Sequence, residues 1–343
     1  MEAIFKPAKA FFKAEPIAID NAVFKMHYRV TFLLLVTASL YVYSNMYKTS
    51  SILCSHGYVT DSFATKLEDQ FCLTHSTHST FGSTTIDHSE YQWVSTVLFL
   101  QALTFYFTRF TFKRFENGRT AIIIQNLNHP LLLEDERKRQ ISNIINYWQN
   151  YRGTHFTLAL TFLLCEIFNL VIVTAQIAIT NLFLGGHFLT IGTNLLQINI
   201  GQNIFPIEQI FPNIAKCTLS SYDTTGLINK RDLFCLLPQN SVHKFVYIAL
   251  WFWYVILSVV TTIHTILQII SFFCPTVKIF LICKMNKCPQ KKLLSLLKLK
   301  ERNYYQSIGD TYMIQQVLKN INNKDIKTEI IDSLSQIITT KDV

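Results

Sequence analysis

The feature that most constrains this chain is an apolar run with aromatic rings at one end and basic side chains at the other. The run extends from Ser95 to Phe107, begins beside Tyr91 and Trp93, and is closed by Arg109, Lys113 and Arg114. Trp and Tyr favour the membrane–water interface, whereas Lys and Arg favour the cytoplasmic side of a membrane. A helix of about twenty mostly apolar residues crosses a bilayer, so we predict that this segment spans one.

The composition of the chain also favours a membrane protein. Half of the 343 residues are hydrophobic and 15% are charged, whereas about a quarter of the residues of a soluble domain are charged. The apolar residues are bunched into long runs rather than spread along the chain. The formal net charge of +9 could suggest nucleic-acid binding, but the basic residues form no single patch with interleaved aromatics. We therefore expect no nucleic-acid partner.

Four apolar runs follow this plan, and they divide the chain. We predict transmembrane helices over 30–47, 91–112, 156–184 and 243–273. The third run exceeds the roughly twenty residues that a bilayer requires, so it should tilt or project beyond the lipid. The remaining segments are a basic arm (1–29), two polar loops (48–90 and 185–242), a charged helical segment (113–155) and a basic helical tail (274–343).

The basic arm has an amphipathic pattern. Its apolar residues recur at helical spacing and would share one face of a helix; they are Ile4, Phe5, Ala8, Phe11 and Phe12. Such an arm could lie on the lipid surface or fold back against other helices, and the pattern does not choose between these positions. No short apolar core with a cleavage site follows its lysines, so we expect no cleavable signal peptide.

The distribution of Lys and Arg predicts the orientation in the membrane. These residues concentrate in the arm, in the 109–155 segment and in the tail. The two polar loops contain few of them: Lys48, Lys66, Lys216, Lys230 and Arg231. Because cytoplasmic loops carry the excess of positive charge, both termini and the middle segment should be cytosolic, and both polar loops should be extracellular.

Each predicted outer loop contains two cysteines at the same interval, Cys54 and Cys72 in one loop, Cys217 and Cys235 in the other. Extracellular space is oxidising, so four cysteines there predict two disulfides. Three pairings are possible, and the spacing does not choose among them. Either way, disulfides would fix the two loops as one rigid outer domain. The other four cysteines should be reduced.

No metal site or catalytic site is predicted. His75 and His78 could suggest zinc, but no carboxylate or cysteine completes a ligand set beside them. Glu166 lies inside a predicted span, where a carboxylate must face a partner helix or water; we favour a contact between helices over a pore or gating role. The chain has no nucleophile elbow, phosphate loop or plausible carboxylate pair, so we expect neither an enzyme nor a cofactor.

Several short motifs occur in a fixed order, beginning with Tyr91-Gln92-Trp93-Val94, and together they resemble those of the innexins, the invertebrate gap-junction proteins. Tyr91-Gln92-Trp93-Val94 is similar to the signature at the start of the second innexin helix. The other motifs are Cys72-Leu73-Thr74-His75-Ser76-Thr77, Leu164-Cys165-Glu166, Phe183-Leu184-Gly185-Gly186, Cys235-Leu236-Leu237-Pro238-Gln239-Asn240, Trp251-Phe252-Trp253 and Ile308-Gly309-Asp310. Each motif is weak alone, but their order with two cysteines per outer loop is specific. Connexins, by contrast, carry three cysteines per outer loop.

The resemblance implies an all-α integral membrane protein with four transmembrane helices, cytosolic termini, a disulfide-stapled extracellular loop domain and a helical cytoplasmic domain. Subunits would form an octameric ring around a pore. Disulfides would join Cys54 to Cys235 and Cys72 to Cys217. The arm would fold into the pore mouth, where its pore-lining residues would be Ile4, Phe5, Lys6 and Lys9.

The function implied by the resemblance is a gap-junction channel that passes ions and small metabolites. It would be a multi-pass protein of the plasma membrane at cell–cell junctions, in contact with membrane lipid. The ring would be homo-oligomeric, or mixed with other innexins, and would dock with an opposed hemichannel. The alternatives are a non-docking hemichannel that releases metabolites and a four-span adhesion or scaffold protein.

The chain also departs from the innexin pattern. Ser95 stands where many members have Pro, and a Pro kink there could serve gating. Thr108-Arg109 lacks the Pro that often separates these residues in the family, and His187 replaces a usual Glu. The compact chain with its short tail resembles the vinnexins carried by insect polydnaviruses.

Overall fold

The computed structural model describes residues 17–48, 52–55, 62–74, 77–81, 84–88, 92–124, 133–151, 153–197, 210–222, 226–286 and 304–340. Two compact units are present. The first unit comprises 1–25, 108–169 and 261–343, and the second comprises 26–107 and 170–260. Three long helices contribute residues to both units, namely α5 (Val94–Glu116), α8 (Phe156–Phe183) and α11 (Pro238–Phe273).

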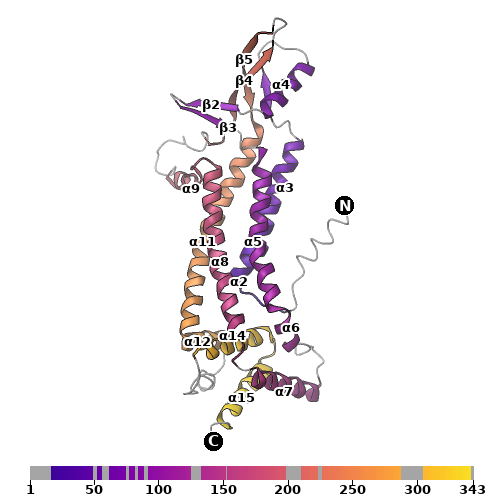
Figure 1. Ribbon diagram of the computed structural model, residues 1–343, viewed down its shortest axis with the longest axis vertical. Coiled ribbons are helices and arrows are strands. Elements are labelled where there is room, and N and C mark those ends of the chain that lie inside the picture. Colours follow the sequence, from indigo (N-terminus) through magenta and orange to yellow (C-terminus); the bar gives the residue numbers. More distant parts are fainter. Residues whose placement is uncertain are drawn as a thin grey trace. The chain divides into compact units, whose positions relative to one another are not determined.

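The second unit has a helical core. The π-helix η1 (Met26–Thr31) continues into α3 (Phe32–Lys48), and the short helix α9 (Phe188–Gln197) follows α8 (Figure 1). Leu98, Phe105, Leu250 and Tyr254 are among the fully buried residues of this core. Buried polar side chains also join its helices: Gln101 Nε2 on α5 donates to Thr180 Oγ1 on α8 at 2.9 Å. Such bonds hold helices together where no water is available.

A glycine explains how α9 packs. The ring of Trp251, on α11, occupies the space that a side chain at Gly192 would need, since a Cβ there would lie 2.2 Å from the indole. The Trp251 indole N–H also donates to the Leu189 carbonyl at 3.3 Å. Trp251, which belongs to the motif Trp251-Phe252-Trp253, therefore packs α9 against α11.

The second unit also contains a five-stranded antiparallel sheet in the order β1-β5-β4-β2-β3. The strands are β1 (Leu53–Ser55), β2 (Thr77–Phe81), β3 (Thr84–His88), β4 (Ile214–Tyr222) and β5 (Ile228–Leu236), and helix α4 (Ser62–Thr74) accompanies them (Figure 1). The all-α prediction is therefore wrong for the two cysteine loops. Leu233 and Cys235 are buried while Phe234 between them is exposed, which is the alternation of a half-buried strand.

All regular secondary structure described in the first unit is helical. This unit contains α2 (Ala22–Lys25), α6 (Arg119–Ile124), α7 (Glu134–Asn150), α12 (Pro275–Asn286), α14 (Tyr304–Asn320) and α15 (Lys324–Thr340), together with the ends of the three long helices. Phe24 stacks on Phe162 at a centroid distance of 6.0 Å, and Phe112 meets Phe162 edge-on at 5.1 Å. These rings form an aromatic centre that joins α2, α5 and α8.

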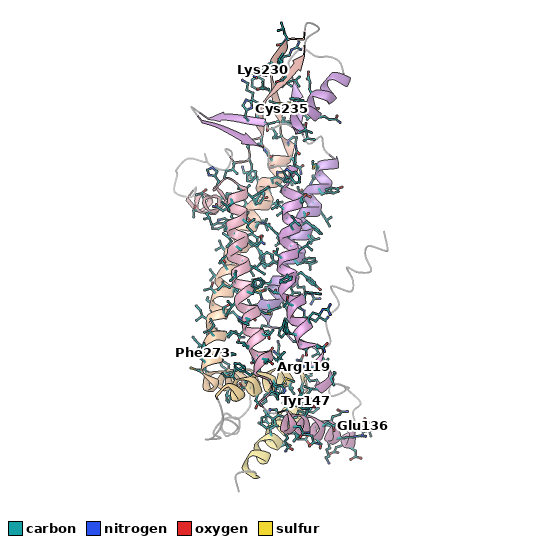
Figure 2. The ribbon with its side chains drawn as sticks, viewed as in Figure 1. Arg119, Glu136, Tyr147, Lys230, Cys235 and Phe273 are labelled. Atoms are coloured by element: carbon teal, nitrogen blue, oxygen red, sulfur yellow. A yellow bond between two sulfur atoms is a disulfide. The ribbon has the colours of Figure 1, made fainter. Side chains whose placement is uncertain are left out.

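The helices predicted for 113–155 and for the tail pack against one another. Ile144 and Trp148 are buried on α7, and Met313, Leu318 and Ile330 are buried on α14 and α15. These five residues line one small apolar cavity. Figure 2 shows Tyr147 on the same helix, α7. Burial raises the pKa of the Tyr147 hydroxyl, and the positive charge of Arg119 partly opposes that rise.

A tight turn joins α5 to α6. Asn117 and Gly118 both have positive φ values, 51° and 74°, and Asn and Gly are the residues that adopt this conformation at least cost. The buried Glu116 carboxylate accepts hydrogen bonds from the Gly118 and Thr120 N–H groups at 2.8 and 2.6 Å. A carboxylate at a helix N-terminus satisfies free N–H groups there and is favoured by the helix dipole.

Three described helices are long and apolar enough to cross a membrane: Ala22–Met46, Phe156–Phe183 and Pro238–Phe273. The first of these helices begins before the predicted span over 30–47. Lys25 and Arg29, which the sequence assigned to the basic arm because of their charge, are part of the helix. Helix α5, which covers the predicted span over 91–112, has 23 residues but ends with basic and acidic side chains: Arg109, Lys113, Arg114 and Glu116.

Candidate functional site

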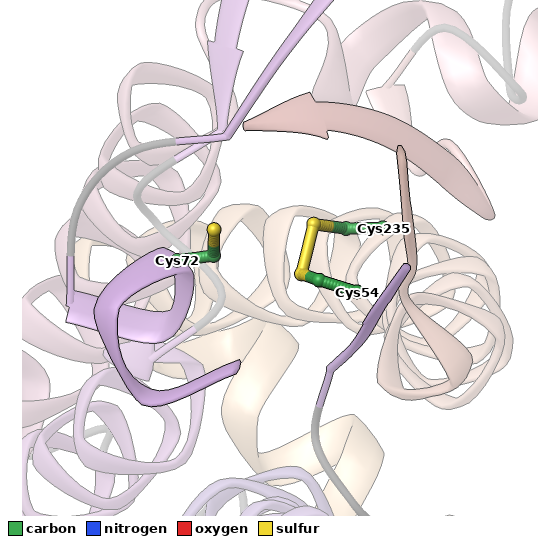
Figure 3. A group of neighbouring side chains, drawn as sticks. All are labelled: Cys54, Cys72 and Cys235. Atoms are coloured by element: carbon green, nitrogen blue, oxygen red, sulfur yellow. A yellow bond between two sulfur atoms is a disulfide. The ribbon is translucent and has the colours of Figure 1, made fainter. Parts of the chain in front are cut away.

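One disulfide joins two strands of the sheet, and a second joins the sheet to helix α4. Cys54 on β1 is bonded to Cys235 on β5, directly opposite it in the strand register. Cys72 on α4 is bonded to Cys217 on β4, and this bond fastens the helix to the sheet. Figure 3 shows the first disulfide, with the Cys72 side chain beside it. This pairing is the one that the family resemblance implies, and it joins the two outer loops to each other twice.

The sulfurs of Cys54, Cys72 and Cys235 lie within 4.8 Å of one another, a spacing compatible with metal ligands. However, zinc and related metals bind the thiolate form of cysteine. Because all three sulfurs are in disulfide bonds, they have no thiolate to offer. The cluster is therefore a structural centre of the sheet rather than a metal site.

Polar contacts complete this disulfide-bonded domain. The Asp69 carboxylate on α4 accepts a hydrogen bond from the Cys54 N–H at 2.7 Å. On the strands, Lys216 and Thr218 both contact Asp232, with distances of 2.7 and 2.9 Å. The hydrogen bond from Lys216 is the main cause that lowers the pKa of the Asp232 carboxyl.

Beside the Lys216–Asp232 pair, one end of the sheet face opposite the disulfides is apolar and exposed. We call it the apolar sheet face, and it consists of Leu53, Ile214, Phe234 and Leu236. These residues lie on one side because Leu53 and Ile214 both pair with Leu236, and Phe234 is two positions along the same strand. Phe234 is 70% exposed and Ile214 is 64% exposed. A contiguous exposed apolar patch of this kind marks an interaction surface.

A second cluster forms at the described end of the N-terminal arm. Asp20 and Arg109 approach to 3.2 Å and are both buried. The Asn21 amide donates to Glu166 Oε1 at 2.9 Å, and Glu166 Oε2 lies 3.3 Å from His264 Nδ1. Glu166 is fully buried. It thus contacts both α11 and the segment before α2.

A third cluster links the tail to the start of α8. The Asp310 carboxylate accepts a hydrogen bond from the Gly153 N–H at 2.9 Å and lies 3.3 Å from His155 Nδ1. The Tyr147 hydroxyl is 3.1 Å from the other ring nitrogen of His155. A Cβ at Gly309 would lie 2.4 Å from the Phe156 backbone nitrogen. The motif Ile308-Gly309-Asp310 is therefore a packing and capping site.

Comparison with known proteins identifies the family of this architecture. A family model described as Innexin matches residues 20–338. The chain is 30% identical to Innexin inx2 of Drosophila melanogaster over 97% of its own length and 95% of that protein. The chain belongs to the innexin family. This innexin is also 29% identical to Innexin inx2 of Schistocerca americana (99% of both chains) and 26% identical to Innexin shaking-B of Drosophila melanogaster (93% and 90%).

Family membership establishes the general class of this innexin. It is a multi-pass membrane protein of a channel-forming family, not an enzyme, and that family implies four spans and assembly into oligomers. The match runs through nearly the whole chain, including the tail. The likeness to the vinnexins of insect viruses is tested by none of these relatives and stays a prediction.

The structure describes part of the innexin signature. Tyr91 lies outside the described residues, Gln92 is half-buried, Trp93 is exposed and Val94 is buried in the helical core. The following Ser95 carbonyl accepts a hydrogen bond from Ser39 on α3 at 2.8 Å. Helix α5 begins at Val94, so position 95 lies in its first turn. A Pro is tolerated there without loss of a helix hydrogen bond, and the expected link between Pro and a kink has no basis at this position.

The predicted pore-lining residues Ile4, Phe5, Lys6 and Lys9 lie outside the described residues, and so does His75. Sequence reasoning missed other residues, including the partners of the arm on α14, Lys319 and Asn320. The sequence offered no signal for them, because helical polar residues of the tail look like a solvated face.

Proposed function

We propose that this innexin is a subunit of a gap-junction channel. Subunits form a ring in the plasma membrane, with both termini and the 113–155 segment in the cytosol and the disulfide-bonded domain outside. Two rings in adjacent cells dock through these outer domains. The resulting pore passes ions and small metabolites without chemistry, by its width and charge.

The observation that carries this proposal is the disulfide-bonded domain formed by both polar loops. Its two disulfides tie β1, β4, β5 and α4 together, so these described elements are held in one arrangement. A preformed surface loses little conformational entropy on binding, which suits a rim that must fit an identical rim. The low number of basic residues in these loops supports their extracellular position.

The apolar sheet face supports assembly into a ring. A large exposed apolar surface is unfavourable in water, and oligomer interfaces cover such surfaces. We propose that a neighbouring subunit of the same ring covers Phe234 and Ile214. Rotational symmetry brings the same patch of every subunit to an equivalent contact.

Finer features of the proposal come from the family resemblance. They are the octameric ring, mixing with other innexins, and an arm that lines the pore mouth with Ile4, Phe5, Lys6 and Lys9. The contacts of Ala18 to Asn21 with α5, α8, α11 and α14 support an arm that is anchored where it leaves the membrane helices.

The deciding experiment measures junctional conductance between two cells that both express this chain. Conductance should appear when both cells express it and should be absent when only one does, because docking needs a ring on each side. Dye uptake by single cells should accompany it. Uptake without coupling would favour the non-docking hemichannel, and the absence of both signals in cells with surface protein would favour an adhesion or scaffold role.

A further inference from the structure

The last described part of the N-terminal arm has no regular structure of its own. Residues 17–21 precede α2 and are themselves not helical. Nevertheless Asp20 is 1% exposed and Ile19 is 7% exposed. Buried backbone groups need hydrogen-bond partners, so the partners of this short segment decide where the arm leaves the helices. We call residues 18–21 the arm base.

Helix α14 supplies the partners of the arm base on one side. The Asn320 side-chain oxygen accepts a hydrogen bond from the Ala18 N–H at 2.6 Å, and its amide donates to the Ala18 carbonyl at 3.0 Å. One amide side chain therefore pairs with both backbone groups of one residue, as a neighbouring strand would. Lys319 donates to the Asp20 carbonyl. Burial lowers the pKa of Lys319, while the nearby Asp20 carboxylate raises it.

Three long helices supply the partners on the other side. Arg109 on α5 pairs with the Asp20 carboxylate at 3.2 Å, and Glu166 on α8 accepts a hydrogen bond from the Asn21 amide at 2.9 Å. His264 on α11 lies 3.3 Å from the same Asn21 nitrogen. Side chains from four helices thus hold a segment of four residues. Only α14 among these four belongs to the tail.

Helix α14 is itself fixed at its other end. Gly309 packs directly on the backbone at His155 and Phe156, and Asp310 caps the Gly153 N–H. From Asp310 to Asn320 a helix advances about 15 Å. The helix therefore runs from the start of α8 to the arm base.

We infer that α14 positions the N-terminal arm in the pore mouth, and that Asn320 and Lys319 are the positioning residues. The inference rests on the proposed channel function. It makes the tail a determinant of conductance, although the tail has no predicted contact with the permeating ions. Binding or modification of the tail that shifts α14 would change the channel through the arm base.

The test compares three variants in the full-length chain. Asn320→Ala removes both hydrogen bonds to Ala18. Asn320→Asp keeps the acceptor for the Ala18 N–H but replaces the donor with a second carboxylate oxygen facing the Ala18 carbonyl. Lys324→Ala changes an exposed residue at the start of α15 and serves as the control. Surface protein is quantified for each variant, so that loss of folding is separated from altered channels.

We expect Asn320→Ala and Asn320→Asp channels at the surface to differ from wild type at least twofold in unit conductance or open probability. Lys324→Ala should match the wild type. A merely structural role for Asn320 would lower surface protein and leave single-channel properties unchanged, and that outcome would overturn the inference. If neither Asn320 variant reached the surface, the exchange measurement below would decide.

Amide hydrogen exchange of the purified chain tests the anchor without any channel record. The peptide containing residues 17–21 should exchange roughly tenfold faster in Asn320→Ala, because a tenfold change is about 1.4 kcal/mol, which is within the cost of leaving a buried group without its hydrogen bond. The Asp variant retains the bond to the Ala18 N–H and should exchange less fast. If the peptide exchanges at the wild-type rate in Asn320→Ala, Asn320 does not anchor the arm base and the inference is overturned. If Asn320→Ala exchanges faster but the wild-type chain conducts no current, the anchor of the arm base stands and the proposed channel function is rejected.

Discussion

At the scale of single residues, Lys278 shows how burial sets a pH dependence. Its ammonium lies 5.0 Å from the centre of the Tyr312 ring and is almost fully buried. Burial lowers the pKa of Lys278 to about 7, whereas an unfolded lysine has a pKa of about 10.4. Between these two values the folded chain binds fewer protons than the unfolded chain. The free energy of unfolding should therefore rise as the pH rises through this window.

Lys278→Met tests this account. The variant should be more stable than wild type by about 1–4 kcal/mol at neutral pH, since apolar residues often replace buried charges favourably. In this variant the free energy of unfolding should also rise less between pH 7 and about pH 10 than it does in the wild type, because the contribution of Lys278 is absent. Thermal unfolding of the solubilised chain at pH 7 and pH 9.5 measures both effects. Lys284→Met, on the exposed side of the same helix, is the control, and an equal pH dependence in both variants would contradict the argument.

Gly309 is a residue whose identity is set by a close approach of two backbones. A methyl group there would lie 2.4 Å from the Phe156 nitrogen and 2.5 Å from the His155 carbonyl carbon. Neither backbone atom can yield as a flexible side chain would. Gly309→Ala should therefore destabilise the first unit by roughly 2–4 kcal/mol. A thermal unfolding midpoint within a degree of wild type would show that α14 can shift away from α8 without cost.

At the scale of elements, the start of α5 determines what position 95 can do. Because Ser95 lies in the first turn, Ser95→Pro should leave the helix straight and cost little stability. The voltage dependence of junctional current should stay within the wild-type range. A proline placed at Thr104, whose position is well inside α5, is the comparison and should cost about 3 kcal/mol or more. Altered gating with Ser95→Pro and a stable fold would show that this turn moves during gating.

The disulfides act on different elements of the outer domain. Cys54–Cys235 joins neighbouring strands, whereas Cys72–Cys217 attaches α4 to β4. Loss of either bond should cost about 2–5 kcal/mol, and Cys54→Ser should abolish coupling because β1 is then no longer covalently fixed to β5. Junctional conductance with matched surface protein measures this. Wild-type coupling in Cys54→Ser or Cys235→Ser would mean that a rigid outer domain is not needed for docking.

The elements also show what the sequence could predict. Long helices such as α8 are readable from hydropathy alone, and α7 lies within the charged helical segment predicted over 113–155. The strands of the cysteine loops were missed, because their short and largely polar segments carry a weak alternation signal. The pairing of Ala18 with Asn320 joins residues 302 positions apart. No local pattern reports such a contact, since it exists only once the tail is folded.

At the scale of the whole molecule, the apolar sheet face predicts how subunits meet. Phe234 is 70% exposed in the single chain, while its strand neighbours Leu233 and Cys235 are buried. Phe234→Lys would place a charge in the proposed contact between subunits, where desolvation of an unpaired charge is costly. The fold of the subunit should survive, because this side chain contributes little to the subunit's own core.

The expected result is a solubilised protein that is largely monomeric, whereas wild type forms a ring, as measured by native mass spectrometry. Lys230→Ala changes an exposed residue on the same strand and should leave the ring intact. The second measurement decides where the face acts. If Phe234→Lys rings form normally but two cells no longer couple, the apolar sheet face contacts the opposed ring instead of the neighbouring subunit. If rings and coupling are both normal, the face is in neither interface, and lipid or another protein covers it.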